Sequence, residues 1–216
     1  MTIVWVIVVV LLLWLAAHLI WRWLCRYYSL PCPTLFASAL NTTVMHTLLR
    51  TNTTLDRIGF HPGQRVLEIG PGPGRLLIPA AQRILPGGEA VGIDIQPGMI
   101  KRLNKRKAAA RLDNLAGIIG DATQPIVAPE TFDLVFLCTT LGEIPDREAV
   151  LSRCHEALKP GGWLSNTEIF LDPHYQSRTT VLRLANSAGF EWQKTEGNAF
   201  FYTMTFIKPN RLSRFN

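Results

Sequence analysis

The sequence has few cysteines, and their placement excludes two common uses of this residue. No pair has the short spacing of a zinc site, and the set does not form the framework of a disulfide-rich secreted domain, which is consistent with a reducing compartment. The four are Cys25, Cys32, Cys138 and Cys154. Internal repeats and low-complexity stretches are also absent. Because no cysteine pair has ligand spacing, we expect no metal site. A length of 216 residues is sufficient for one domain with a sizeable core and an appendage.

Formal charge is missing from a long stretch near the amino terminus. Ile3 to Trp21 contains no Asp, Glu, Lys or Arg, and this run of about nineteen mostly apolar residues can cross a bilayer as a helix. A cleavable signal peptide is the main alternative. However, no Lys or Arg precedes the run, the run is longer than a usual signal core, and no small-x-small cleavage site follows it. We therefore predict a transmembrane anchor with an interfacial belt over residues 1–28.

The residues after the apolar run predict its orientation. Aromatic side chains of the kind that gather at membrane interfaces follow or end it, namely Trp21, Trp23, Tyr27 and Tyr28. Arg22 and Arg26 are the first positive charges, and they lie on the carboxyl side of the run. The positive-inside tendency then predicts a single-pass membrane protein whose remaining chain is cytoplasmic.

A glycine-rich turn is the most informative motif of the chain. Residues 66–74 read VLEIGPGPG, so an apolar strand passes directly into a turn in which two prolines separate three glycines. Glycine removes the Cβ atoms that would block a ligand, and proline stiffens the turn. A dinucleotide fingerprint would need glycine where Arg75 stands, and no Gly-Lys-Ser or Gly-Lys-Thr of a Walker loop follows. The remaining pattern is an acid, Glu68, placed two positions before G-x-G-x-G.

This pattern resembles motif I of the class I S-adenosylmethionine-dependent methyltransferases, and further blocks follow in the order of that family. Ala90 to Asp94 is similar to its second strand, whose terminal acid accepts hydrogen bonds from the ribose hydroxyls. Gly120-Asp121-Ala122 is similar to its third-strand turn, where the acid accepts from the adenine amino group and the next backbone N–H meets a ring nitrogen. Phe132 to Leu137 and Leu158 to Gly162 resemble the fourth strand and the turn before the fifth.

The resemblance covers about residues 60 to 208 and implies S-adenosylmethionine as the cofactor. The implied cofactor-binding residues are Glu68, Gly70, Gly72, Gly74, Asp94, Ile95, Asp121 and Ala122. Each acid also has a structural alternative. Asp94 or Asp121 alone would fit a helix N-cap, and Glu68 can accept backbone N–H bonds from the glycine turn.

The pattern of the remaining chain predicts an α/β fold. Strands are expected at residues 65–69, 90–94, 115–119, 133–138 and 162–168 with helices between them, which requires a mostly parallel sheet. Two more strands, at 190–194 and 200–208, are joined by the turn 196–198 without a helix. The resemblance implies a Rossmann-like seven-stranded sheet with this antiparallel hairpin at its end. We assign residues 60–216 to the methyltransferase domain.

Residues 29–59 form a predicted linker and amino-terminal helical cap. Residues 41–58 carry apolar positions at roughly helical spacing and end at Gly59. In methyltransferases of this type the segment before the first strand covers the active site. Phe36, Met45 and His46 are therefore candidates for lining the acceptor pocket, with packing on the sheet edge as the alternative.

Polar residues after the fourth and fifth strands are the candidate catalytic group. Open α/β sheets bind ligands at the carboxyl ends of their strands. Glu143 follows strand four, Glu168 ends strand five and His174 comes shortly after it. Methyl transfer needs mainly alignment and exclusion of water, and it needs a base only when the acceptor must lose a proton. Asp172 and Tyr175 belong to the same stretch, although Asp172 can instead cap a helix beginning near His174.

The stretch from Glu168 to Phe190 looks similar to methyltransferases related to the ubiquinone and menaquinone C-methyltransferases. Together with the predicted anchor, it suggests a lipid or lipophilic acceptor in the membrane, such as a quinone precursor, an isoprenoid or a phospholipid amine. The alternatives are methylation of a membrane protein and a non-catalytic module that binds S-adenosylmethionine. The basic run Lys101 to Lys107 fits a solvated helix face or an anionic lipid surface, and without interleaved aromatic residues it does not suggest nucleic acid. The oligomeric state is left open.

Overall fold

The computed structural model describes residues 2–28, 47 and 49–210, with some side chains of the first helix, including those of His18 and Arg26, outside the description. The helices are α1 (Thr2–Tyr28), α3 (Thr51–Ile58), α4 (Leu77–Arg83), α5 (Pro97–Ala109), α6 (Arg147–Ala157) and α7 (Arg178–Ser187). The strands are β1 (Arg65–Ile69), β2 (Glu89–Asp94), β3 (Leu115–Ile119), β4 (Phe132–Cys138), β5 (Leu158–Ile169), β6 (Glu191–Gly197) and β7 (Phe201–Ile207). The candidate pocket residues Phe36, Met45 and His46 lie outside the described residues.

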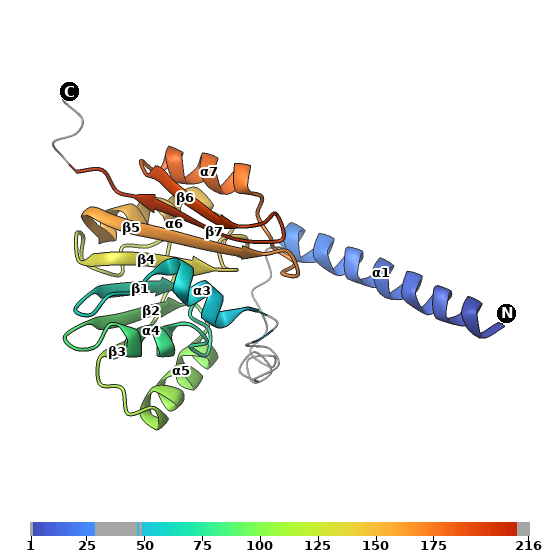
Figure 1. Cartoon of the computed structure of the whole chain (residues 1–216), viewed down its shortest axis with the longest axis horizontal. Coiled ribbons are helices and arrows are strands. Elements are labelled where there is room, and N and C mark those ends of the chain that lie inside the picture. Colours follow the sequence, from blue (N-terminus) through green and yellow to red (C-terminus); the bar gives the residue numbers. More distant parts are fainter. Residues whose placement is uncertain (1, 29–46, 48, 211–216) are drawn as a thin grey trace.

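The strands form one seven-stranded sheet in the order β3-β2-β1-β4-β5-β7-β6 (Figure 1). The first five strands of the chain pair in parallel, and β7 runs antiparallel to both of its neighbours. The predicted Rossmann-like sheet with a closing antiparallel hairpin is confirmed. The strand order reverses between β1 and β4, which places a crevice at the carboxyl ends of these two strands.

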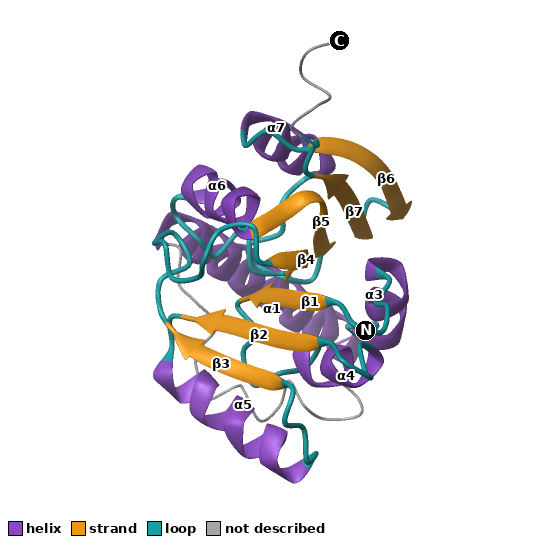
Figure 2. Cartoon of the chain, turned by 90° about the vertical axis from the view of Figure 1, so that its left-hand side faces the viewer, coloured by secondary structure: helices purple, strands orange, loops and turns teal. Residues whose placement is uncertain are grey.

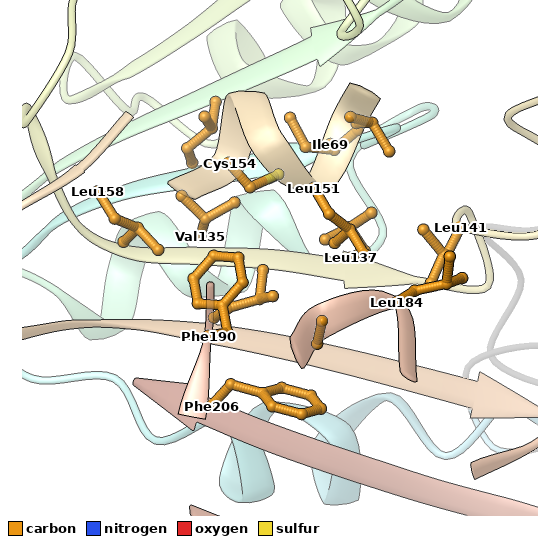
Figure 3. Close-up of a cluster of buried hydrophobic side chains, with 14 of the residues drawn as sticks. Ile69, Val135, Leu137, Leu141, Leu151, Cys154, Leu158, Leu184, Phe190 and Phe206 are labelled. Atoms are coloured by element: carbon orange, nitrogen blue, oxygen red, sulfur yellow. The ribbon is translucent and has the colours of Figure 1, made fainter. Parts of the chain in front are cut away.

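The sheet has a hydrophobic core on each face, and β4 contributes to both. Val135 and Leu137 belong to a cluster with residues of α6 and α7 (Figure 3). Leu134 and Phe136 belong to a second cluster with residues of α3, α4 and α5. Successive side chains of a strand point to opposite faces, so an apolar run such as that of β4 is suited to a sheet covered on both sides (Figure 2).

Two strands differ from their predicted bounds. β5 begins at Leu158 rather than at residue 162, because Leu158 pairs with Phe132 before an irregularity shifts the register to Trp163 opposite Leu134. The glycines expected as a turn before the strand are therefore part of an interrupted strand. β6 likewise continues through Gly197, with an irregularity between Trp192 and Lys194, so the hairpin turns after the position predicted for it.

Helix α1 extends away from the sheet, and its carboxyl-terminal end meets the domain (Figure 1). Within it, Val4–Cys25 is long and apolar enough to cross a membrane, and its most apolar window is 0% buried. A core helix of a soluble protein would be mostly covered, whereas these side chains face outward. The predicted apolar helix is present, although length and composition also fit a signal sequence.

Candidate cofactor and acceptor site

The glycine turn is held at the carboxyl end of β1 by two backbone donors. The Gly70 N–H donates to the carbonyl oxygen of Ile93 at 2.8 Å, and the Gly72 N–H donates to Oδ2 of Asp94 at 3.0 Å. Both glycines have positive φ, 68° and 53°, which L side chains rarely adopt. A Cβ on Gly72 would meet no atom within 4 Å, so the turn leaves open space for a ligand at this point.

Gly70 offers a direct test of the packing of this turn. A Cβ on Gly70 would lie 2.5 Å from Cγ2 of Thr140, whereas a Cβ on Gly63, which also has positive φ, would meet nothing within 4 Å. Gly63→Ala is therefore a matched control for backbone strain, which costs about 1 kcal/mol. We expect Gly70→Ala to lower the free energy of unfolding by roughly 1–3 kcal/mol more than Gly63→Ala, measured by urea unfolding. Equal losses would contradict this packing.

Asp94 links the glycine turn to β2. Its Oδ2 accepts from Gly72, and its Oδ1 accepts from the Gln96 N–H at 2.9 Å. Burial raises the pKa of Asp94, and the two backbone donors oppose that shift because they stabilise the carboxylate. Each carboxylate oxygen can accept more than one hydrogen bond, so these bonds leave capacity for ribose hydroxyls. Ile95 follows and is 60% exposed, so its surface is available to an apolar ring.

Asp121 lies next to Asp94 at the same edge of the sheet. The Gly120 N–H donates to the carbonyl oxygen of Asp94 at 3.0 Å, which joins the ends of β2 and β3. Asp121 is exposed, and its Oδ1 accepts from both the backbone N–H and the hydroxyl of Thr123, at 3.0 and 2.8 Å. This local turn fixes the carboxylate in place, while Ala122 packs partly against the core.

Glu68 is buried beneath the glycine turn, with Arg75 nearby. Burial raises the pKa of Glu68 to about 8, the positive charge of Arg75 opposes the shift, and Asp94 adds to it. The Glu68 Oε2 is buried with no hydrogen-bond partner among the described residues. Such an acceptor fits a ligand that brings an N–H donor.

The sequence reasoning missed the role of Arg75, which it used only to exclude a dinucleotide fingerprint. The side chain is buried and donates to Oγ1 of Thr51 at 3.1 Å and to Sγ of Cys138 at 3.2 Å. It thereby joins α3 to the end of β4 beside Glu68. The only signal in the sequence was that Arg75, a large cation, stands where the dinucleotide-binding motif has glycine.

Together these residues fit S-adenosylmethionine. The open turn at Gly72, the buried oxygen of Glu68 and the acids at the ends of β2 and β3 provide a cradle and acceptors for its amino and hydroxyl groups. Whether each residue contacts the cofactor stays a prediction.

The basic run on α5 divides into two parts. Arg106 is half-buried and donates to the carbonyl oxygen of Pro73 at 2.7 Å, so it supports the glycine turn. Lys101, Arg102 and Lys105 are exposed. Only this outer part is available to solvent or to an anionic surface.

Of the candidate catalytic residues, Glu143 lies in the turn after β4, Glu168 lies near the end of β5, and His174 lies in the segment after β5. A Cβ on Gly142 would overlap the backbone carbonyl of His174, so the absence of a side chain lets these two segments pack closely. Glu143 follows Gly142 and is half-buried, while Glu168 and His174 are buried. The structure thus brings the three onto neighbouring segments, and their catalytic roles stay predictions.

Glu168 is enclosed in a polar pocket. Its Oε1 accepts from the side-chain amide of Asn166 at 3.1 Å, and its Oε2 accepts from the Gln176 N–H at 3.1 Å. Burial raises the pKa of Glu168 to about 8, and these two donors oppose the shift. Oδ1 of Asn166 is buried without a partner among the described residues. If the amide is turned over, a protonated Glu168 can donate to that oxygen, so the surroundings suit the neutral acid.

The last turns of α1 contact the segment after β5. The His174 Nε2 lies 3.0 Å from the carbonyl oxygen of Cys25, which can only accept, so Nε2 donates. Arg22 donates to the carbonyl oxygen of Phe170 at 2.6 Å, and its guanidinium carbon lies 4.9 Å from the centre of the Phe170 ring. The sequence did not indicate that α1 and the candidate acceptor site would touch.

Asp172 does not cap a helix beginning near His174. It accepts from the His174 N–H at 2.8 Å in a local turn, and α7 begins at Arg178 with Ser177 as its cap. Pro173 and this turn delay the helix. Burial raises the pKa of Asp172 to about 6, while the His174 N–H and the charge of Arg22 oppose the shift.

Comparison with known proteins identifies the class of the domain. A family profile described as a methyltransferase domain matches residues 66–162. The nocamycin O-methyltransferase of Saccharothrix syringae is 34% identical over 113 residues, which cover 52% of this chain and 40% of that protein. The ubiquinone biosynthesis O-methyltransferase of Chromobacterium violaceum is 30% identical over 162 residues, which cover 74% of this chain and 65% of that protein.

A solved structure shows the same fold. The S-adenosylmethionine-dependent methyltransferase of Aquifex aeolicus superposes with a TM-score of 0.76 over 82% of this chain and 100% of that chain, at 16% sequence identity. The predicted family, fold and cofactor class are confirmed. This chain therefore carries a methyltransferase domain, which the family profile matches over residues 66–162, and its seven-stranded sheet has the fold of S-adenosylmethionine-dependent methyltransferases.

Proposed function

We propose that this protein is a single-pass membrane methyltransferase that transfers a methyl group from S-adenosylmethionine to a lipid or a lipophilic small molecule, with its catalytic domain on the cytoplasmic side. The observation that carries the proposal is the contact between α1 and the segment after β5. Arg22 and Cys25 of the apolar helix bind Phe170 and His174, which lie at the carboxyl end of the sheet. The anchor therefore leaves the domain beside the candidate acceptor site.

The character of the acceptor site supports a lipophilic substrate over a protein side chain. A groove that binds a basic protein segment would expose ionised acids to solvent. Here Glu168 is 1% exposed and its pKa is raised to about 8 by burial, and the pKa of Asp172 is raised to about 6 for the same reason. Among the described residues at this edge, the larger exposed side chains include Phe170 and Leu171. An apolar acceptor suits these surroundings.

The chemistry asks little of the protein beyond placement. S-adenosylmethionine supplies an electrophilic methyl group on a sulfonium. The glycine turn and Asp94 fix the position of the donor, and the segments carrying Glu143 and His174 orient the acceptor and exclude water. If the acceptor must lose a proton, Glu168 is the candidate general base, because its pKa of about 8 is near neutrality. Its carboxyl group is buried, so the residues around it must move before it can reach the acceptor.

A labelling experiment tests the proposed function. The purified full-length protein in lipid nanodiscs is incubated with methyl-labelled S-adenosylmethionine and a total membrane extract, and the lipid and protein fractions are then separated. We expect label in the lipid fraction, and far less of it at the same cofactor concentration when Asp94→Asn replaces the native protein. Label in protein would favour a protein methyltransferase. Binding of the cofactor without transfer to either fraction would favour a non-catalytic module, and both results contradict the proposal.

A further inference from the structure

Exposed apolar side chains surround the point where α1 meets the domain. Phe170 and Leu171 follow β5, and Phe200 lies in the turn between β6 and β7, with exposed fractions of 44%, 64% and 64%. The rings of Phe170 and Phe200 contact each other edge to face, with centroids 5.3 Å apart. Two segments thus build one apolar surface, which we call the exit collar and define as Phe170, Leu171 and Phe200.

The exit collar lies at a defined level along α1. Arg22 donates to the carbonyl oxygen of Phe170 and lies over its ring. The apolar run of α1 ends at Trp21, so the collar is within about one helical turn, or ~5 Å, of the end of that run. Trp23 and Tyr27 are exposed at this level and stack with ring centroids 5.5 Å apart. Aromatic side chains at the end of an apolar span are typical of the membrane interface.

We propose that the exit collar inserts into the boundary between headgroups and acyl chains of the bilayer that α1 crosses. The inference rests on the membrane anchor of the proposed function. Once α1 spans the bilayer, the contacts of Arg22 and Cys25 hold Phe170 and its neighbours at the interface. Burial of exposed Leu and Phe side chains there is favourable, and contiguous apolar surface at a soluble face usually marks such a contact.

The consequence concerns the direction from which the acceptor reaches the site. Glu168 and His174 are close to the collar. Glu168 comes two residues before Phe170 at the end of β5, and Tyr175, next to His174, contacts the Phe170 ring with centroids 5.5 Å apart. The carboxyl edge of the sheet would then face the membrane, and α1 leaves the domain at that edge (Figure 1). An acceptor dissolved in the bilayer can enter sideways past the collar without crossing water.

The test uses quenching of a fluorescent label by lipids. The full-length protein carries Cys32→Ser, so that the native thiols left are those of Cys25, Cys138 and Cys154, which are buried. The same protein without an introduced cysteine gives the background labelling. Single cysteines are introduced as Leu171→Cys in the collar, as His61→Cys on the exposed loop before β1, and as Leu12→Cys in the middle of α1. Each is labelled with the environment-sensitive dye NBD in nanodiscs of phosphatidylcholine with or without doxyl-labelled lipid.

We expect shallow doxyl lipid to quench the label at position 171 several-fold more than the label at position 61, and deep doxyl lipid to quench the label at position 12. Quenching at 12 without quenching at 171 would overturn the inserted collar and leave the anchor intact. A water-soluble quencher such as iodide is added in a parallel measurement. If the label at position 171 is protected from that quencher and is not quenched by doxyl lipid either, protein covers the collar, and the proposed insertion is overturned. No lipid quenching at either site would overturn both the anchor and the collar.

Discussion

Replacement of Asp94 by Asn is expected to weaken binding of S-adenosylmethionine and of its demethylated product by about 100-fold, or about 3 kcal/mol. The carboxylate accepts from the N–H groups of Gly72 and Gln96 and has further capacity for ribose hydroxyls. An Asn side chain has only one oxygen that accepts, so it can accept from only one of these two N–H groups. Its NH₂ group then faces the other N–H, and two donors cannot form a hydrogen bond. The variant therefore loses the bond that fixes the glycine turn as well as acceptors for the ligand.

Isothermal titration calorimetry on the full-length protein measures this effect. Asp113→Asn is a suitable control because it removes the same charge from an exposed loop away from the glycine turn. We expect the control to bind within a few-fold of the native protein. If Asp94→Asn also bound within a few-fold, Asp94 would be a structural cap and the site would have to be placed elsewhere.

The second large effect concerns pH and the two buried glutamates. The pKa of Glu168 and that of Glu68 are each raised from 4.5 to about 8 by burial. Between pH 4.5 and pH 8, each of these glutamates keeps its proton in the folded state and has lost it in the unfolded state. The unfolded state therefore binds fewer protons, and stability falls as pH rises from about 4.5 to about 8. The limiting slope for one such group is about 1.4 kcal/mol per pH unit.

Glu168→Gln removes the contribution of Glu168 to this pH dependence. The amide mimics the neutral acid, keeps an oxygen for the Gln176 N–H and can donate to Oδ1 of Asn166. We expect the variant to be more stable than the native protein at pH 8 by on the order of 3 kcal/mol, and to differ little near pH 4.5. Urea unfolding in mild detergent at several pH values measures both.

Glu191→Gln is the matched control for this experiment. Glu191 is an exposed acid at the start of β6, so its replacement should leave the pH dependence unchanged. The remaining slope in Glu168→Gln is then assigned to Glu68 together with Asp94 and Asp172, whose pKa values burial also raises. An unchanged slope in Glu168→Gln would mean that Glu168 is ionised in the folded protein, and the interpretation of its pocket as one for a neutral acid would be wrong.

Local patterns in the sequence were sufficient for the sheet and the cofactor turn. The strands around Val66, Ala90 and Leu115 are short apolar runs bounded by turn residues, and a sheet covered on both faces requires such runs. The glycine turn and Asp94 could be recognised because their spacing follows from one strand-helix-strand unit. The bounds of β5 and β6 were less accurate, because irregular pairing with neighbouring strands decided them.

The sequence by itself determined the seven-stranded fold, the family and the apolar amino-terminal helix, because each depends on residues close together in the chain. Only the tertiary structure decided that Arg75 lies beside Glu68, that Gly142 lets the turns after β4 and β5 pack together, and that Arg22 and Cys25 contact the segment after β5. Arg22 and Phe170 are 148 residues apart, and no local propensity relates them. The pKa values of the buried acids likewise follow from desolvation, which arises only when distant segments close around a carboxyl group.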